Sequence, residues 1–183
     1  MKTIKLAQTF SFVAKFVLLF CLFYFGTILV ISLAAPGGLY SQFVHDYLDY
    51  VSWLKISYEK GASWIAGLFG YTTSEEDGFL IRVIGGRGVI VAYDCVGYGV
   101  MSFWAAFVIS YPGKKKSRLI WLALGLLILW LINTTRIGLF LVAINKKWDM
   151  PLGFDHHTWF NIFAYGAIFM MMYFYDKSGE IGK

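Results

Sequence analysis

The chain has 183 residues, of which 58% are hydrophobic, 20% aromatic and only 15% charged. Soluble domains average about 45–50% apolar and about 25% charged residues, so this composition and the mean hydropathy of +0.63 indicate an integral membrane protein. Intrinsic disorder is excluded because it requires few aromatic and aliphatic residues, and two cysteines are too few for a disulfide scaffold. The length fits one membrane domain over residues 1–183.

A membrane-spanning helix needs about 20 mostly apolar residues. Four segments approach or exceed this length: residues 16–35, 88–111, 119–144 and 158–175. The first is longer than the apolar core of a signal peptide, about 7–15 residues, and we interpret it as an uncleaved anchor. The sequence therefore predicts an all-α integral membrane protein with about four transmembrane helices.

Lysine and arginine collect on the cytoplasmic side of membrane proteins, so their positions orient the predicted spans. Basic residues cluster at the N-terminus, with Lys2, Lys5 and Lys15, and in the link YPGKKKSR between the second and third spans. Both chain termini are therefore expected in the cytoplasm, and residues 36–87 outside. The net charge of +5 is mostly a topology signal, and we predict no nucleic-acid partner.

The external segment 36–87 contains two predicted features. Residues from about 41 to 68 mix aromatic, aliphatic and charged side chains, which predicts one or two amphipathic helices on the outer surface. After an expected turn at residues 74–78, two β-branched runs at 79–84 and 89–93 flank a glycine-rich turn and predict a β-hairpin. If the hairpin forms, the second helix begins near Asp94 rather than at residue 88.

Ionisable residues inside apolar spans are costly, so each one in this chain needs an explanation. Asp94 and Cys95 lie at the outer end of the second predicted span, and His156 and His157 come just before the fourth. Arg136 lies in the third span, about 13 Å below its outer end, and a guanidinium can reach outward by snorkelling. A cysteine, an arginine and a histidine from three helices are therefore expected at similar depth near the outer face.

A cysteine with a nearby histidine is the smallest thiol nucleophile pair, and an arginine can favour a thiolate or hold a developing oxyanion. The three residues together thus indicate acyl-transfer chemistry. Each alone has a simpler interpretation: Cys95 as a small buried side chain, His157 as a helix cap, and Arg136 in a structural ion pair with Asp94. Under that alternative the protein is a non-enzymatic membrane assembly or transport component.

The sequence predicts neither a metal site nor a cofactor. Paired-cysteine spacing is missing, and adjacent histidines on a helix point about 100° apart, so they do not easily share one ion. Cys21 lies in the middle of the first span among apolar residues, and we expect it to be inert.

Three motifs of this sequence resemble the signatures of the exosortase/archaeosortase family. They are the Cys-x-Gly of VIVAYDCVG at residues 89–97, the Asn-x-x-Arg of NTTRI at residues 133–137, and the histidine of DHHTWFN at residues 155–161. The motifs follow one another on successive predicted spans, and the resemblance covers residues 79–175. The first half of the chain resembles the family only in having an anchor and an external segment.

The resemblance implies a membrane-embedded thiol transpeptidase or protease of the bacterial cytoplasmic membrane, with its active site facing outward. Such enzymes act on secreted proteins whose C-terminal signal combines a short motif, a transmembrane helix and a basic tail. Carried over to this sequence, Cys95 is the nucleophile, Arg136 the charged stabiliser and His157 the acid/base. The acceptor would be water or a lipid-linked or sugar amine.

Four more residues are expected to support this site. Asn133 lies one helical turn before Arg136 on the same helix face and would orient it. Asp94 and Gly97 belong to the cysteine motif, and His156 is the alternative to its neighbour as the acid/base.

One position near these motifs matches the family pattern and another departs from it. His157 is favoured over its neighbour because Asn161, four residues on, occupies the small or polar position expected after the histidine. Val96 departs from the pattern, since many members have serine after the cysteine. The chain also looks like a compact version that lacks the extra amino-terminal spans of larger members.

Overall fold

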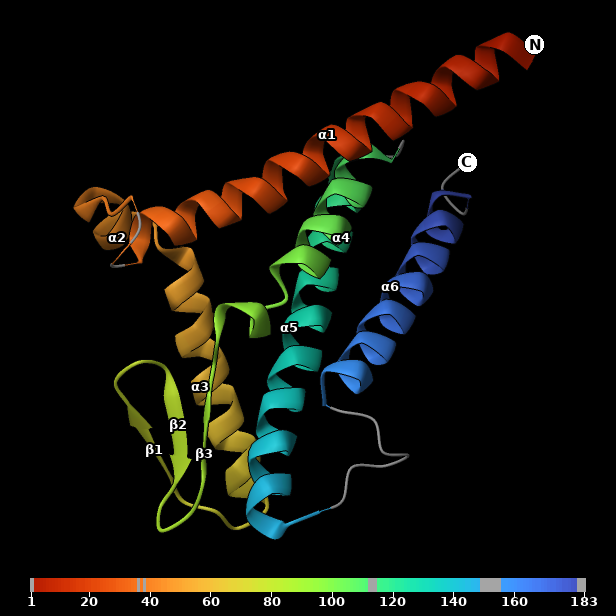
Figure 1. The fold of residues 1–183 in the computed structure, drawn as a ribbon. Coiled ribbons are helices and arrows are strands. Elements are labelled where there is room, and N and C mark those ends of the chain that lie inside the picture. Colours follow the sequence, from red (N-terminus) through yellow and green to blue (C-terminus); the bar gives the residue numbers. More distant parts are fainter. Residues whose placement is uncertain (1, 36, 38, 112–114, 149–155, 181–183) are drawn as a thin grey trace.

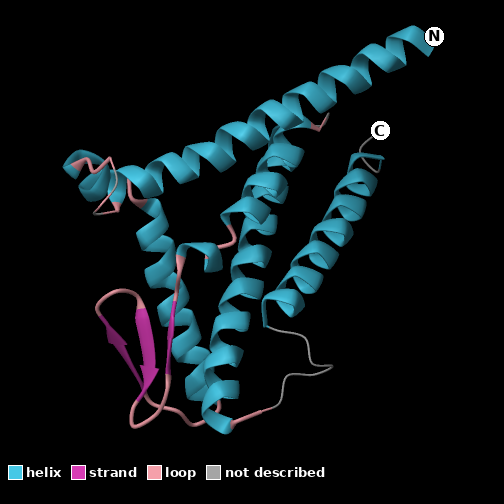
Figure 2. Ribbon diagram, viewed as in Figure 1, coloured by secondary structure: helices cyan, strands magenta, loops and turns pink. Residues whose placement is uncertain are grey.

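A computed structural model of the protein describes residues 2–35, 37, 39–111, 115–148 and 156–180, without the side chains of residues 2–8, 115–116, 156–157, 160 and 178–180. The chain is mostly helical and carries one small antiparallel sheet, as Figure 2 shows. In chain order the elements are α1 (Lys2–Ala34), α2 (Gln42–Tyr47), α3 (Tyr50–Leu68), β1 (Thr73–Glu76), β2 (Leu80–Val83), β3 (Gly88–Ile90), the 3₁₀ turn Tyr93–Cys95, α4 (Tyr98–Ser110), α5 (Lys115–Lys146) and α6 (His156–Glu180).

α5 is the central helix of the fold, and α3, α4 and α6 pack along it (Figure 1). α4 lies along its N-terminal half, where Trp104 packs on Gly125 and donates a hydrogen bond of 3.2 Å to the carbonyl of Trp121. α3 lies along the C-terminal half, where Nε1 of Trp130 donates a hydrogen bond of 2.9 Å to Ser57. α5 therefore connects the part of the fold built on α4 with the part built on α3.

The close contact between α3 and α5 depends on one glycine in each helix. A side chain at Gly61 of α3 would collide with Thr134 of α5, and one at Gly138 of α5 would approach Ile65 of α3 to within 2.8 Å. Because both contacts advance along the two helices in the same direction, α3 and α5 run parallel. This packing brings the buried face of α3 next to the polar residues 133–136 of α5.

α1 packs against α4 through aromatic side chains. Residues four apart lie on one face of a helix, and α1 carries aromatic residues at this spacing. Ring contacts join Phe12, Phe16, Phe20 and Tyr24 of α1 to Tyr98, Phe103 and Phe107 of α4 and to Tyr111, which follows α4. Many of the other large side chains of α1 are exposed, which suits a helix surrounded by lipid.

The predicted β-hairpin is confirmed: β2 and β3 pair antiparallel, with Leu80 opposite Ile90. A third strand, β1, pairs with β2, so the expectation of a turn over residues 74–78 is wrong for most of that segment. The turn that joins β1 to β2 occupies residues 77–79, where Gly78 has a φ of 82°. β1 carries only polar side chains, so it lacks the apolar alternation by which a strand is recognised in sequence.

Three of the four segments predicted to span the membrane lie within single helices, namely 16–35 largely in α1, 119–144 in α5 and 158–175 in α6. The second segment, 88–111, is wrong in its first half, because residues 88–97 form β3 and the cysteine-bearing turn. α4 begins only at Tyr98, and its 13 residues give a length of about 20 Å. That is shorter than the hydrocarbon core of a bilayer, about 30 Å.

In the described part of the chain, two helices are long and apolar enough to cross a membrane, Thr9–Ala34 and Ser117–Lys146. The predicted number of four spans is therefore not confirmed. α4 is apolar but short.

The amphipathic helix expected in the external segment is present as α3, capped by Asp49, whose carboxylate accepts a hydrogen bond of 3.0 Å from the backbone N–H of Ser52. Its buried face contains Val51, Lys55, Tyr58, Glu59, Ala62 and Ala66. α3 packs lengthwise along α5 and also contacts β1 and β2, instead of lying on an outer surface. Three of the six residues on its buried face are polar, namely Lys55, Tyr58 and Glu59.

Candidate active site

Cys95 ends the 3₁₀ turn that joins β3 to α4. Gly97 follows in the left-handed conformation, with a φ of 73°, and is the residue at which α4 is capped. Glycine adopts this conformation at no steric cost, which explains why the Cys-x-Gly motif has glycine at this position. Between them Val96 is fully buried, whereas Cys95 is half-buried.

Two side chains of α5 donate hydrogen bonds to the main-chain carbonyl of Cys95. Nδ2 of Asn133 lies 2.6 Å from this oxygen, and Nη2 of Arg136 lies 3.0 Å from it. The two donors are three residues apart on one helix face, so both can reach a single acceptor. The structure thus brings the cysteine motif and the Asn-x-x-Arg motif into direct contact.

No ion pair joins Arg136 to Asp94 in the described part of the chain. The ion pair found there is between Arg82 and Glu76, at 2.9 Å on the exposed sheet. Arg136 instead contacts the carbonyl of Cys95, the residue after Asp94. The alternative in which Arg136 serves only to neutralise Asp94 therefore lacks the contact on which it depends.

The adjoining carbonyl, that of Val96, accepts a hydrogen bond of 3.0 Å from the hydroxyl of Tyr58 on α3. Tyr58 is fully buried, and burial raises its pKa to about 12. Its phenol therefore stays protonated and remains a donor at physiological pH. Side chains from two different helices thus hold two consecutive carbonyls at the cysteine.

Sequence reasoning missed the three polar residues on the buried face of α3, Lys55, Tyr58 and Glu59. Lys55 and Glu59 are only 4% and 5% exposed. Burial raises the pKa of Glu59, and the nearby Glu75 raises it further. The three residues lie on the same helix face as the apolar residues Val51 and Ala62, but the mixed polarity of the segment does not specify which face is buried.

His156 and His157 lie in the first turn of α6, and their side chains are outside the described part of the structure. Their expected approach to Cys95 therefore stays a prediction. Cys21 lies in α1 and is half-buried, and both cysteines are free thiols. No group of three metal-ligating side chains is found among the described residues.

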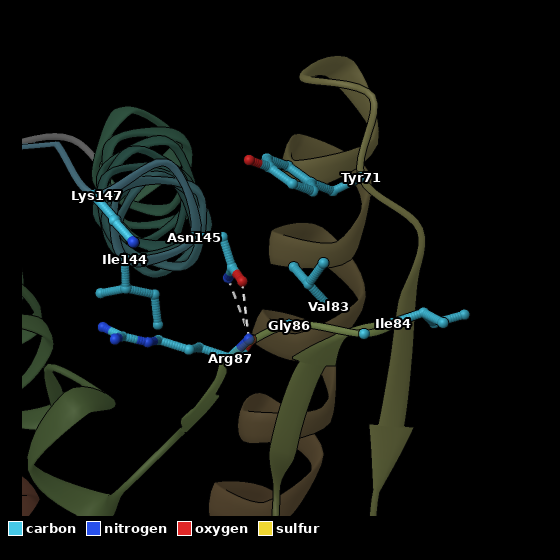
Figure 3. Close-up of a pocket in the computed structure, with 9 residues that line it drawn as sticks. Tyr71, Val83, Ile84, Gly86, Arg87, Ile144, Asn145 and Lys147 are labelled. Carbon is cyan, nitrogen blue, oxygen red and sulfur yellow. Dashed lines mark hydrogen bonds between the residues drawn. The ribbon is translucent and has the colours of Figure 1, made fainter.

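A separate hollow of about 490 Å³ lies at the C-terminal end of α5, as Figure 3 shows. It is lined by the glycine turn at residues 84–87, by Tyr71 and Val83, and by Ile144, Asn145 and Lys147. Asn145 fixes the turn by accepting a hydrogen bond of 2.8 Å from the backbone N–H of Arg87 and donating one of 3.2 Å to its carbonyl. The hollow contains none of the residues to which the sequence analysis assigned chemistry.

The fold and the site define a helical membrane protein whose cysteine-bearing turn is held by an asparagine and an arginine of the central helix. The sequence model of the transmembrane exosortase family matches residues 1–174, so the chain belongs to this family. The match includes the first half of the chain, which the motif resemblance did not cover. No curated protein and no solved structure matches the chain.

Proposed function

We propose that the protein is a membrane-embedded cysteine transpeptidase or protease that cleaves the C-terminal sorting signals of secreted proteins. Membership of the transmembrane exosortase family supports a sorting function. The observation that carries the proposal is the pair of hydrogen bonds from Asn133 and Arg136 to the carbonyl of Cys95. These bonds fix the candidate nucleophile beside the single charged residue of the apolar segment 119–144.

In the first step, Sγ of Cys95 acts as a thiolate and attacks the carbonyl carbon of a peptide bond in the sorting motif. A C–S bond forms, and the carbonyl oxygen becomes the oxyanion of a tetrahedral intermediate. The guanidinium of Arg136 carries five N–H donors in a planar group, and its Nη2 lies at the cysteine turn. Donors of the same group stabilise the oxyanion.

In the second step, the tetrahedral intermediate collapses and the C–N bond breaks. The leaving amine takes a proton from His157, and a thioester remains on Cys95. A lipid-linked or sugar amine, or water, then attacks the thioester after giving a proton to the histidine. The acyl group leaves on the acceptor, and Cys95 returns to its thiolate form.

The proposed setting is the outer face of the bacterial cytoplasmic membrane, with both termini of the chain in the cytoplasm. The basic residues near the N-terminus and around the start of α5 support this orientation. The substrate is a secreted protein ending in a motif, a transmembrane helix and a basic tail. Its helix would lie in the bilayer beside the enzyme and present the motif at the depth of Cys95.

Substitution of the two cysteines tests the proposal, with Cys21→Ala as the matched control for Cys95→Ala. The protein is produced together with a secreted protein that ends in such a signal, and the shortened substrate is measured by immunoblot. We expect Cys95→Ala to abolish shortening and Cys21→Ala to leave it unchanged. Normal shortening by Cys95→Ala, at equal amounts of membrane protein, contradicts the proposed function.

A further inference from the structure

Lys55 of α3 is a buried lysine whose charge is held by aromatic rings. Its Nζ lies 3.7 Å from the ring centre of Phe79 and 4.2 Å from that of Tyr93. Lysine is almost never fully buried unless it is paired, yet Lys55 is 4% exposed. In the described part of the structure, its Nζ makes no ion pair. Burying a lysine is costly, so the position of Lys55 needs a functional or structural explanation.

The rings that hold Lys55 belong to the segment that carries Cys95. Tyr93 begins the 3₁₀ turn that Cys95 ends, and Phe79 precedes β2. Both rings and Cys95 pack against the same cluster of buried residues. Lys55 is therefore fixed, through the Tyr93 ring, to the turn that presents the cysteine.

Acidic groups near Lys55 oppose the effect of burial on its charge, and its Nζ lies over the ring of Tyr93, two residues before Cys95. Burial lowers the pKa of Lys55, and the negative charges of Glu59, Asp49 and an ionised Cys95 oppose this effect. Glu59 is less effective as a counter-ion because burial raises its own pKa and so favours its neutral form. Aromatic faces stabilise a cation without neutralising its charge.

We propose that Lys55 is a supporting residue of the active site, which supplies a second positive charge, from α3, to stabilise negative charge at Cys95. Arg136 supplies the first, from α5. Lys55 acts through its charge and not by contact with the reacting atoms. This inference rests on the proposed function for the identity of the nucleophile, but its test does not use substrate.

The test compares how fast Cys95 reacts with two methanethiosulfonate reagents of similar size and opposite charge, one a sulfonate and one a trimethylammonium. The full chain, purified in detergent, carries Cys21→Ala so that Cys95 is the single thiol. Positive charge at Cys95 favours the anionic reagent. We expect Lys55→Met, which keeps the packing of the lysine stem, to lower the ratio of anionic to cationic rates by about fivefold or more.

Three further variants separate the effect of the charge from that of packing. Lys55→Arg should keep most of the ratio, because it retains the cation. Lys60→Met, on the exposed side of the same helix, is the matched control and should leave the ratio unchanged. Lys55→Gln serves as a second neutral variant if Lys55→Met does not insert, and we expect the same fall.

The outcomes separate this inference from the proposed function. An unchanged ratio in Lys55→Met or Lys55→Gln overturns the role of Lys55, and so does a faster reaction of the unaltered protein with the cationic reagent. Failure of Cys95 to react with either reagent also counts against it. If the ratio falls as expected while Cys95→Ala still shortens substrate, the charge effect stands and the proposed function fails.

Discussion

Three side-chain hydrogen bonds end on two consecutive carbonyl groups, those of Cys95 and Val96. Backbone that is neither helix nor strand leaves its carbonyls without regular partners, and burial of such groups is costly. At membrane depth irregular backbone is tolerated only where the protein itself satisfies it. Asn133, Arg136 and Tyr58 provide those partners, and by doing so they fix the position of the cysteine between them.

Tyr58→Phe tests this anchoring because it removes the hydroxyl and keeps the ring. The Val96 carbonyl then loses its 3.0 Å partner, and we expect the free energy of unfolding to fall by about 1–3 kcal/mol. Denaturant unfolding of the protein in detergent micelles measures the change. Tyr47→Phe, at an exposed position of α2, is the control and should change stability by less than about 0.5 kcal/mol. Equal stability of the two variants contradicts the anchoring role.

The same variant has an expected pH signature. The pKa of Tyr58 is raised from 10.0 to about 12, so the folded state holds this proton more tightly than the unfolded state does. Its contribution to stability is complete below pH 10 and is lost as the pH rises towards 12. The stability difference between the unaltered protein and Tyr58→Phe should therefore narrow over this interval.

The residues of the site differed in how far the sequence could predict them. Asn133 and Arg136 could be predicted to share a helix face, because the spacing of three residues alone determines that. Tyr58 and Lys55 could not be singled out, because their importance depends on which face of α3 is buried against α5. That packing is tertiary information, and the mixed polarity of residues 41–68 does not specify it.

At the scale of elements, the parallel packing of α3 on α5 determines whether Tyr58 and Asn133 can reach the same turn. Gly61 permits this packing because Thr134 of α5 occupies the space where a side chain would be. Thr134 is the residue after Asn133, so any displacement of α5 here moves a hydrogen-bond donor of the cysteine turn. Glycine costs helix stability, and its use at this point is explained by the close contact.

Gly61→Ala should lower the free energy of unfolding by about 1–3 kcal/mol, because overpacking forces Thr134 to move. Gly67→Ala is a matched control on the same helix, since no atom lies within 4 Å of the position of its new methyl group. Alanine favours helix over glycine, so this control should be unchanged or more stable by up to about 1 kcal/mol. Equal effects of the two substitutions would contradict the glycine contact.

The sequence predicted most elements correctly, and its errors have identifiable causes. Residues 88–111 were interpreted as one span because hydropathy does not distinguish a buried strand from a helix. The β-branched run Val89–Ile90–Val91 and the glycines before it favoured the hairpin, which is the structure that forms. β1 escaped prediction because an exposed strand with only polar side chains has no periodic apolar signal.

At the scale of the whole molecule, α5 links the membrane to the cysteine turn. Its 32 residues extend for about 48 Å, which exceeds the hydrocarbon thickness of about 30 Å. α4 covers only about 20 Å and begins three residues after Cys95. A cysteine at the start of a short helix, beside a longer one that carries Arg136, suits an enzyme that meets its substrate near a membrane boundary.

The central claim is that Cys95 forms a thioester with the substrate, and mass spectrometry of the trapped intermediate tests it most directly. The unaltered protein is quenched in mild acid while it processes substrate, because acid preserves a thioester, and it is then digested. We predict a peptide containing Cys95 that carries the acyl part of the sorting motif and loses it on treatment with neutral hydroxylamine. Shortened substrate without any such adduct, in a protein whose Cys95→Ala variant is equally active, would contradict the account.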